Sequence, residues 1–158
     1  MATPEFILAL REKIGHVPLW LSGVTAIVVR GDDVLLVRRA DTGEWAPVCG
    51  IIDPGEEPAV AAAREVLEEA DIHALVEHLA WVHVTGMYTY ANGDQTQYVD
   101  IVFRLQWESG EPSPADGENT DARWFHRDAL PEMSRDMGQR VRAGLDPDAA
   151  ARFTPFDD

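Results

Sequence analysis

Apolar residues recur at a helical spacing near both ends of the chain. Phe6, Leu10 and Ile14 stand four residues apart, with Thr3-Pro4 before them as a helix start and Gly15 after them as a helix end. A second stripe with this spacing predicts a helix that turns its apolar side to the core. That stripe consists of Met133, Met137, Val141 and Leu145. We therefore expect an N-terminal helical arm, a C-terminal helix and, beyond residue 146, a surface tail.

Between these helices the pattern changes to one typical of strands. Residues 24–29 and 34–37 are apolar runs separated by a turn sequence, which predicts a buried hairpin. Asn92-Gly93 favours the turn of a second hairpin. The strand that follows alternates, with polar residues such as Asp100 and Arg104 on one face. Its other face carries Val99, Ile101, Phe103, Leu105 and Trp107. This period of two predicts a strand that buries one face only.

A turn and a further helix are expected in the middle of the chain. Asp53-Pro54-Gly55 places proline and glycine where a type II turn needs them, and a helix follows from about Pro58 to Ala70. The stretch 109–120 is rich in proline, glycine, serine and acids, which indicates a loop before a short strand at 123–125. Strands and helices mix without a repeat or linker, so the sequence predicts one α/β domain in which helices cover a sheet.

The composition of the 158-residue chain narrows the classes of function. Its formal net charge of −15, from 28 acidic and 13 basic residues, repels polyanions, so we expect no duplex nucleic acid as a partner. No apolar run is long enough to span a membrane, and the first residues lack the pattern of a secretory signal. Cys49 is the only cysteine, so no intrachain disulfide is possible. These features predict a cytoplasmic protein without a membrane partner.

Three glutamates are expected on one side of the helix at 58–70. At about 100° per residue, Glu65, Glu68 and Glu69 share a side. The opposite side, which we expect to face the core, carries Ala59, Ala63, Val66 and Ala70. Like charges four residues apart destabilise a helix by roughly 0.2–0.5 kcal/mol per pair. Carboxylate clusters suit hard cations such as Mg²⁺ or Mn²⁺. The alternative from spacing alone is a solvated acidic helix face.

The stretch from Gly50 to Ile72 resembles the Nudix box. That motif is Gly, five residues, Glu, seven residues, then Arg-Glu-apolar-x-Glu-Glu-x-Gly-apolar. Six fixed positions match at the required spacing: Gly50, Glu56, Arg64, Glu65, Glu68 and Glu69. The resemblance implies an α/β/α sandwich around a mixed β-sheet, with the box forming a loop, a helix and a loop. Asp71 stands where the motif has glycine, so we expect Asp71 in a left-handed conformation, at some cost.

The resemblance also implies roles for residues inside the box. Glu65 and Glu69 are expected to bind Mg²⁺ or Mn²⁺ directly, and Glu68 directly or through water. The backbone carbonyl of Cys49 is expected as a further ligand. Arg64 and Glu56 are expected to form a salt bridge that fixes the loop to the helix. A simple pair between Arg64 and Glu68 is a compatible alternative. Gly50 and Gly55 are expected to give the loop its permitted backbone conformations.

Residues outside the box are also candidates for the site. Arg39, the second residue of an arginine pair, is expected to contact substrate phosphate or to lie at a solvated edge. Trp45 is a candidate for stacking on a base, with core packing as its alternative. Glu118 lies six residues before Trp124, a spacing frequent in similar enzymes, and is expected to serve as a catalytic base. Its alternative is solvation in an acidic loop, and its rivals are Glu111, Asp116 and Asp121.

Together these features predict a hydrolase of phosphate anhydrides. With Glu65, Glu68, Glu118 and Arg64 in catalytic roles, the expected substrate is a nucleoside diphosphate linked to another moiety. The alternative is a nucleotide-binding or regulatory module without turnover. Prenyl diphosphate isomerisation, known on a related fold, needs a catalytic cysteine outside the box, and Cys49 is the only cysteine. We expect an arm at 1–20 that packs on the domain or on a second subunit of a homodimer, a Nudix domain at 21–145 and a tail at 146–158.

Overall fold

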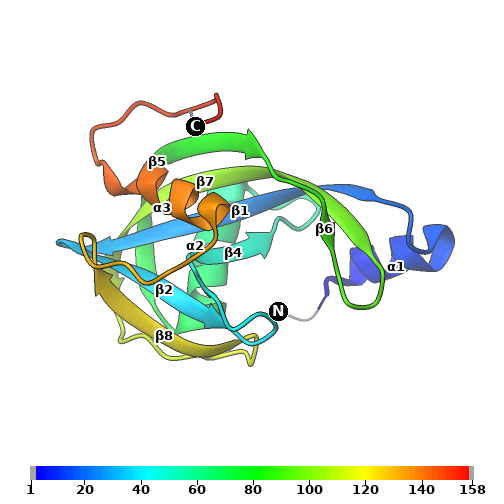
Figure 1. Ribbon diagram of the computed structural model, residues 1–158, viewed down its shortest axis with the longest axis horizontal. Helices are drawn as coiled ribbons and strands as arrows, with labels where there is room; N and C mark the ends of the chain where they lie inside the picture. Colours follow the sequence, from blue (N-terminus) through cyan, green and yellow to red (C-terminus); the bar gives the residue numbers. More distant parts are fainter. Residues whose placement is uncertain (1–2, 157–158) are drawn as a thin grey trace.

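A computed structural model describes residues 3–156, and its ribbon is shown in Figure 1. The helices are α1 (Glu5–Ile14), α2 (Pro58–Ala70) and α3 (Arg135–Leu145). The strands are β1 (Leu19–Arg30), β2 (Asp33–Arg39), β3 (Trp45–Ala46), β4 (Val48–Ile51), β5 (His73–Val84), β6 (Tyr88–Thr89), β7 (Gln95–Ser109) and β8 (Asn119–His126). Within the described residues, these strands join into one eight-stranded sheet.

The sheet is mixed, because one strand pair is parallel and the rest are antiparallel. Its main path runs β3-β2-β1-β7-β5, while β4 pairs with β1, β6 with β7 and β8 with β2. β1 and β7 run parallel over eleven residue pairs, from Leu19 beside Thr96 to Val29 beside Gln106. Helices α2 and α3 lie on opposite sides of this sheet, with α3 nearer the viewer in Figure 1. The predicted fold class, an α/β/α sandwich around a mixed sheet, is confirmed.

β1 is apolar on both faces because each face meets a helix. Val24 and Val28 pack into the cluster that contains Val66 of α2. Ile27 and Val29, which alternate with them, pack into the cluster that contains Val141 of α3. The predicted hairpin is also present, since β1 and β2 pair at Val29 with Val34 and at Arg30 with Asp33. A continuous apolar run therefore marks a strand buried between two layers.

The expectation that β7 buries only one face is wrong. Asp100 and Arg104, on the face expected to be polar and open, are 3% and 8% exposed. α3 covers this face, and the Arg104 guanidinium donates hydrogen bonds to the backbone oxygens of Gly144 and Leu145 at 2.9 and 3.0 Å. The polar residues on this face are therefore buried and paired under a helix that follows much later in the chain.

Two helix starts differ from the sequence prediction. α1 begins at Glu5 with Pro4 at the N-cap and no side-chain hydrogen bond there, so Thr3 does not cap it. α3 begins at Arg135, capped by Ser134, whose hydroxyl accepts from the Met137 backbone N–H at 3.3 Å. Met133 therefore lies before the helix, although it packs in the same cluster. The predicted bounds of α2 match the structure at both ends.

α1 contacts the hairpin between β6 and β7, beside which it lies in Figure 1. Arg11 donates to the backbone oxygen of Gln95 at 2.7 Å and forms an ion pair with Asp94 at 3.5 Å. His16 also lies 2.8 Å from Asp94. These contacts attach the arm to its own chain, and a role in joining two copies stays a prediction.

The C-terminal tail is more closely attached than the expected surface extension. The Arg152 backbone N–H donates to Ala80 at 2.8 Å, and its oxygen accepts from Val82 at 2.9 Å. The ring of Phe156 packs edge-on against Trp81, with ring centres 5.0 Å apart. The tail thus covers the outer edge of β5. No helix within residues 3–156 is long and apolar enough to cross a membrane.

Candidate active site

The box begins with a strand and a tight turn that lead into α2. β4 pairs with β1, so that Gly50 lies beside Val24. In the turn Asp53-Pro54-Gly55, Gly55 has φ +86° and the Glu56 backbone N–H donates to Asp53 at 3.0 Å. This is the geometry expected of a type II turn. The turn reverses the chain so that the first residues of α2 return towards β4.

Arg64 connects the turn to the helix. Its Nε and Nη2 donate to the two carboxylate oxygens of Glu56, both at 2.8 Å. Its Nη1 donates to Glu65 at 2.9 Å and to Glu68 at 3.3 Å. Both contacts expected of Arg64, with Glu56 and with Glu68, are therefore present. The hydrogen bonds from Arg64 hold the pKa of Glu56 below its ordinary value, so this carboxylate stays ionised.

Glu65 lies against Gly50 and is fully buried. A Cβ atom on Gly50 would come within 2.1 Å of the Glu65 carboxylate carbon, so only glycine fits at this position. Gly50 was expected to supply backbone freedom, but Gly55 and not Gly50 has a positive φ. Gly50 instead allows the side chain of Glu65 to lie directly against the backbone of β4. Oε1 of Glu65 accepts from Arg64, whereas Oε2 is buried without a hydrogen-bond partner among the described residues.

Glu69, one turn further along α2, is 4% exposed and faces the loop before β8. Its Oε2 accepts a hydrogen bond from the Asn119 side chain at 2.9 Å. The same loop is tied to the end of α2, because the backbone N–H of Ser113 donates to Ala70 at 3.0 Å and that of Ala115 to Glu69 at 3.3 Å. The sequence analysis missed Asn119, although it placed the neighbouring Glu118 in this region.

Burial sets the protonation of these two carboxyls. Loss of solvation raises the pKa of Glu65 to about 8, against the opposing charge of Arg64. Burial likewise raises the pKa of Glu69 to about 7, and the hydrogen bond from Asn119 opposes this rise. Both shifts penalise the charged form. Two buried carboxyls four residues apart therefore carry an electrostatic cost that a nearby positive charge would relieve.

The expected arrangement of the three glutamates needs a correction. Glu65 and Glu69 do not lie on a face opposite the core, because both are buried. The buried residues of α2 are Ala61, Ala62, Glu65, Val66, Glu69 and Ala70. Only Glu68, with 43% of its side chain exposed, lies on the open side and contacts Arg64. Within residues 3–156, no three acidic, histidine or cysteine side chains are close enough together to hold a metal ion.

Asp71 ends α2 in the left-handed conformation that was expected. It has φ 55° and ψ 37°, and its backbone N–H donates to the oxygen of Leu67. Among residues 3–156, it is the only residue other than glycine with a positive φ. α2 thus ends, two residues after Glu69, in a strained backbone conformation at Asp71.

Cys49 lies in β4 beside Thr25 of β1. Its thiol is near the Thr25 hydroxyl at 3.5 Å and the Arg140 guanidinium at 3.7 Å. Burial raises the pKa of the thiol to about 11, so it stays protonated and unreactive near neutral pH. Arg140 belongs to a buried polar network that the sequence analysis missed. It reaches the Thr25 hydroxyl at 3.0 Å and Asp100 at 3.4 Å.

The two predicted substrate-binding residues lie on the paired strands β2 and β3 but make different contacts. Arg39 pairs with Asp41 through two hydrogen bonds of 2.9 and 2.7 Å, which raise its pKa, and the charge of Glu69 contributes to this rise. Trp45 packs edge-on against Phe125, with ring centres 4.8 Å apart, in the cluster on the α3 side. This packing favours the core alternative for Trp45.

Glu118 lies in the loop that docks on α2. Its backbone oxygen accepts from Ala40 at 2.8 Å, and its backbone N–H donates to Asp116 at 3.0 Å. The next residue, Asn119, reaches Glu69. The chain around Glu118 is therefore held between the end of β2 and the helix that carries the box glutamates.

Comparison with known proteins decides the family. The model of the NUDIX domain matches residues 20–152. The chain belongs to the Nudix family. The match covers every residue of the β4, turn and α2 unit described above.

Two relatives of known name are similar to most of this chain. The NAD-capped RNA hydrolase NudC of Pseudomonas syringae pv. syringae (strain B728a) is 34% identical over 109 residues, 68% of this chain and 36% of the relative. A MutT-like protein of Streptomyces ambofaciens is 35% identical over 121 residues, 76% of this chain and 73% of the relative. This Nudix chain thus spans about a third of the NudC length.

Solved structures confirm the Nudix fold. A crystal structure of a UDP-X diphosphatase aligns with a TM-score of 0.68 and covers 98% of this chain and 76% of its own. Its sequence is 21% identical, so the likeness concerns the fold alone. The alignment over nearly the whole chain places α1 and the tail within the compared length.

Proposed function

We propose that this Nudix protein hydrolyses a phosphate anhydride bond in a nucleoside diphosphate linked to another moiety. The observation that carries the proposal is the pair of buried carboxylates on α2. Among residues 3–156, Glu65 keeps one oxygen without a hydrogen bond, and Asn119 compensates Glu69 only in part. Buried charges without partners are costly, and evolution retains them where they bind a ligand or take part in chemistry.

The donor atoms of the box are of the kind that a divalent cation binds, although the described side chains must move closer together to hold one. Carboxylate and carbonyl oxygens are the ligands that Mg²⁺ and Mn²⁺ prefer. We assign Glu65, Glu68, Glu69 and the backbone carbonyl of Cys49 as the groups that would hold it. Glu68 now contacts Arg64, so it must turn away from that guanidinium to take part. When bound, such a cation screens phosphate charge and acidifies a coordinated water.

The chain's own residues supply the remaining parts of the reaction. Arg64 binds Glu56 and thereby fixes the turn relative to the helix. In this arrangement the side chain of Glu65 lies directly against Gly50. Arg39 would bind a phosphate oxygen after exchanging its contact with Asp41. Glu118 would accept the proton of the attacking water, because its loop is docked beside Glu69.

A substrate panel with a metal titration tests the proposal. Nucleotide sugars, dinucleotides and nucleoside triphosphates are incubated with Mg²⁺, and the phosphorylated products are separated. We expect turnover that disappears in excess chelator and falls by orders of magnitude in Glu69→Gln, with an unchanged circular dichroism spectrum. Full activity in chelator would refute the metal role.

The alternative of a binding module is tested by the same samples. Such a module would bind a nucleotide in calorimetry without releasing product at any metal concentration. The box keeps all of its carboxylates, Glu56, Glu65, Glu68 and Glu69, which favours turnover over binding alone.

The role of Glu118 has its own test. Glu118→Gln should lower kcat by about 10²-fold or more while KM changes little, because a base acts on the attacking water and not on substrate binding. The control is Glu111→Gln, an exposed acid paired with Arg30 at 3.3 Å. If kcat is the same in Glu118→Gln as in the unmodified protein, a box glutamate is the base.

A further inference from the structure

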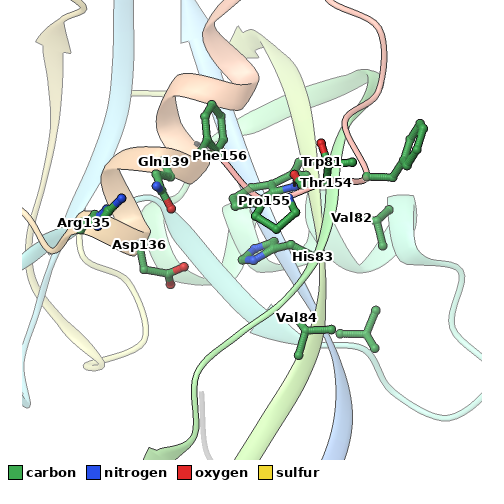
Figure 2. A pocket seen from close by; sticks show the side chains of 12 residues that line it. Trp81, Val82, His83, Val84, Arg135, Asp136, Gln139, Thr154, Pro155 and Phe156 are labelled. Carbon is green, nitrogen blue, oxygen red and sulfur yellow. Dashed lines mark hydrogen bonds between the residues drawn. The ribbon is translucent and has the colours of Figure 1, made fainter. Parts of the chain in front are cut away.

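A cavity of about 480 Å³ lies beyond the outer part of β5, away from the α2 carboxylates. Its walls come from β5, the first turns of α3 and the C-terminal tail, as Figure 2 shows. The volume is in the range of small-molecule sites. None of the residues assigned above to the box or to substrate binding lines this cavity.

One wall carries polar groups that are only partly used. Asp136 and Gln139 project from α3 to the same side, and Asp136 is directed towards the ring of His83 on β5 (Figure 2). Oδ2 of Asp136 accepts from Arg140 and Tyr88, which leaves its other oxygen without a hydrogen bond among the described residues. Within residues 3–156, the Gln139 amide also has no hydrogen-bond partner. His83, with 8% of its side chain exposed, is fixed by Asp100 at 3.0 Å.

The other wall is apolar and open. Val84 is 55% exposed and Phe153 is 83% exposed, and Pro155 of the tail also lines the cavity. A cavity with an apolar wall and a wall of unused hydrogen-bonding groups suits a flat heterocyclic ligand. Such a ligand covers the apolar surface with its face and meets the polar groups with its edge.

We propose that this cavity binds a nucleobase that carries an exocyclic amino group. The amino group donates to the free oxygen of Asp136, and the Gln139 amide both donates to and accepts from the neighbouring ring edge. Asp136 is already paired with Arg140, and the cavity has an apolar wall, which suits an uncharged heterocycle. The binding claim does not rest on the proposed hydrolysis.

The site connects physically to the box through paired residues across the sheet. His83 pairs with Asp100, Asp100 with Gly23, and Gly23 with Ile51. Three steps between neighbouring strands amount to about 14 Å. Arg140 also joins the two regions, since it contacts Asp136 on the cavity wall and Thr25 beside Cys49. The base therefore belongs either to the substrate of the box or to a separate nucleoside that acts as an effector.

Calorimetry without metal tests binding apart from hydrolysis. Adenosine is the probe, and inosine is its matched partner because a carbonyl replaces the amino group. We expect adenosine to bind at least about tenfold more tightly than inosine. Gln139→Ala should weaken adenosine binding, and Val84→Trp, which fills the cavity from an exposed position, should abolish it. Glu132→Ala, an exposed change just before α3, is the control and should bind normally.

Three results would overturn the proposal. The first is that adenosine does not bind to the unmodified protein. The second is that inosine binds as tightly as adenosine. The third is that Gln139→Ala and Val84→Trp bind adenosine as tightly as the unmodified protein does. Hydrolysis assays then identify the source of the base. A raised KM at constant kcat in Gln139→Ala assigns it to the substrate, and a change of kcat on adding adenosine assigns it to an effector. Loss of the proposed hydrolysis alone leaves the binding result intact.

Discussion

Gly50 and Glu65 share a space that only the hydrogen of glycine leaves free. The side chain of Glu65 is folded over the backbone of β4, so the position of its carboxylate depends on a residue fifteen places earlier. Arg64 then fixes one of its oxygens and leaves the other open. At this scale the site is built from steric complementarity first and charge second.

Gly50→Ala should displace Glu65 and reduce metal affinity by about tenfold or more, while most of the stability is kept. The added methyl group meets a movable side chain and not the backbone, which explains the small effect on folding. Manganese binding by calorimetry measures the first effect and urea unfolding the second.

The control for this change is Gly55→Ala. Gly55 has φ +86° and no atom within 4 Å of an added Cβ, so alanine there should cost about 1 kcal/mol of stability through backbone strain alone. Manganese affinity should be kept. Equal metal affinity in Gly50→Ala and the unmodified protein would show that Glu65 does not need this contact.

Asp71→Gly should preserve stability or raise it by about 1 kcal/mol at most. Asp71 holds φ 55°, a conformation that costs glycine nothing, although the added chain freedom of glycine offsets part of the gain. Turnover should change little, because Asp71 lies past the last carboxylate of the box. A large loss of activity in this variant would reveal a chemical role for Asp71.

At the scale of elements, local signals explain which segments the sequence predicts well. α2 is bounded by Pro58 in its first turn and by Asp71 beyond its end, so both limits are encoded within the segment. The sequence predicts a strand before Asn92-Gly93 but not the bounds of β5, because pairing with β7 shifts register at His73/Ala74, Val76/His78 and Leu79/Trp81. Each bulge breaks the alternation on which strand recognition depends.

In the candidate site, too, contacts within one segment are predicted from the sequence and contacts between distant segments are not. The contact between Arg64 and Glu56 follows from motif spacing within one segment. The contact between Asn119 and Glu69 joins segments 50 residues apart, so it depends on how the loop docks. Burial of Asp100 under Arg140 likewise depends on α3, which follows late in the chain. Sequence patterns describe neighbours along the chain, and these contacts are between neighbours in space only.

Removal of the tail should destabilise the protein through the edge of β5. Deleting residues 149–158 removes Phe156 from Trp81 and exposes the backbone that Arg152 covers. We expect the free energy of unfolding to fall by about 2 kcal/mol or more, with increased aggregation at the bare strand edge. Urea unfolding and light scattering measure the two effects.

Phe153→Ala is the control that shows whether the loss of stability on deleting the tail comes from the packed residues of the tail. Phe153 lies in the same tail but is 83% exposed, so its loss should change stability by less than about 0.5 kcal/mol. A tail deletion as mild as Phe153→Ala would mean that the tail contributes nothing to the β5 edge.

At the scale of the whole molecule, the buried carboxyls couple stability to pH. Burial raises the pKa of Glu65 from 4.5 to about 8 and that of Glu69 to about 7. A raised pKa in the folded state means that the stability from these groups is fully present below pH 4.5 and is lost as the pH rises through 7 to 8.

In chelator, the melting temperature should therefore decrease between about pH 5 and 8, and Glu65→Gln should flatten this decrease. Mg²⁺ should restore stability mainly at the upper end of the range, where the carboxylates are ionised. Scanning calorimetry across pH, with and without Mg²⁺, gives the measurement. A pH-independent melting temperature in chelator would contradict burial of the two groups.

The parallel pairing of β1 with β7 has a consequence for how the chain reaches this structure. Leu19 meets Thr96, and Val29 meets Gln106, so the centre of the sheet closes only when segments far apart in sequence come together. Closing so long a loop costs chain entropy before any contact repays it, which slows folding. During synthesis on a ribosome, β1 and the box must wait for β7 to emerge. Folding speed thus depends on a contact remote from the carboxylates, and a variant can lose yield in the cell with its chemistry unchanged.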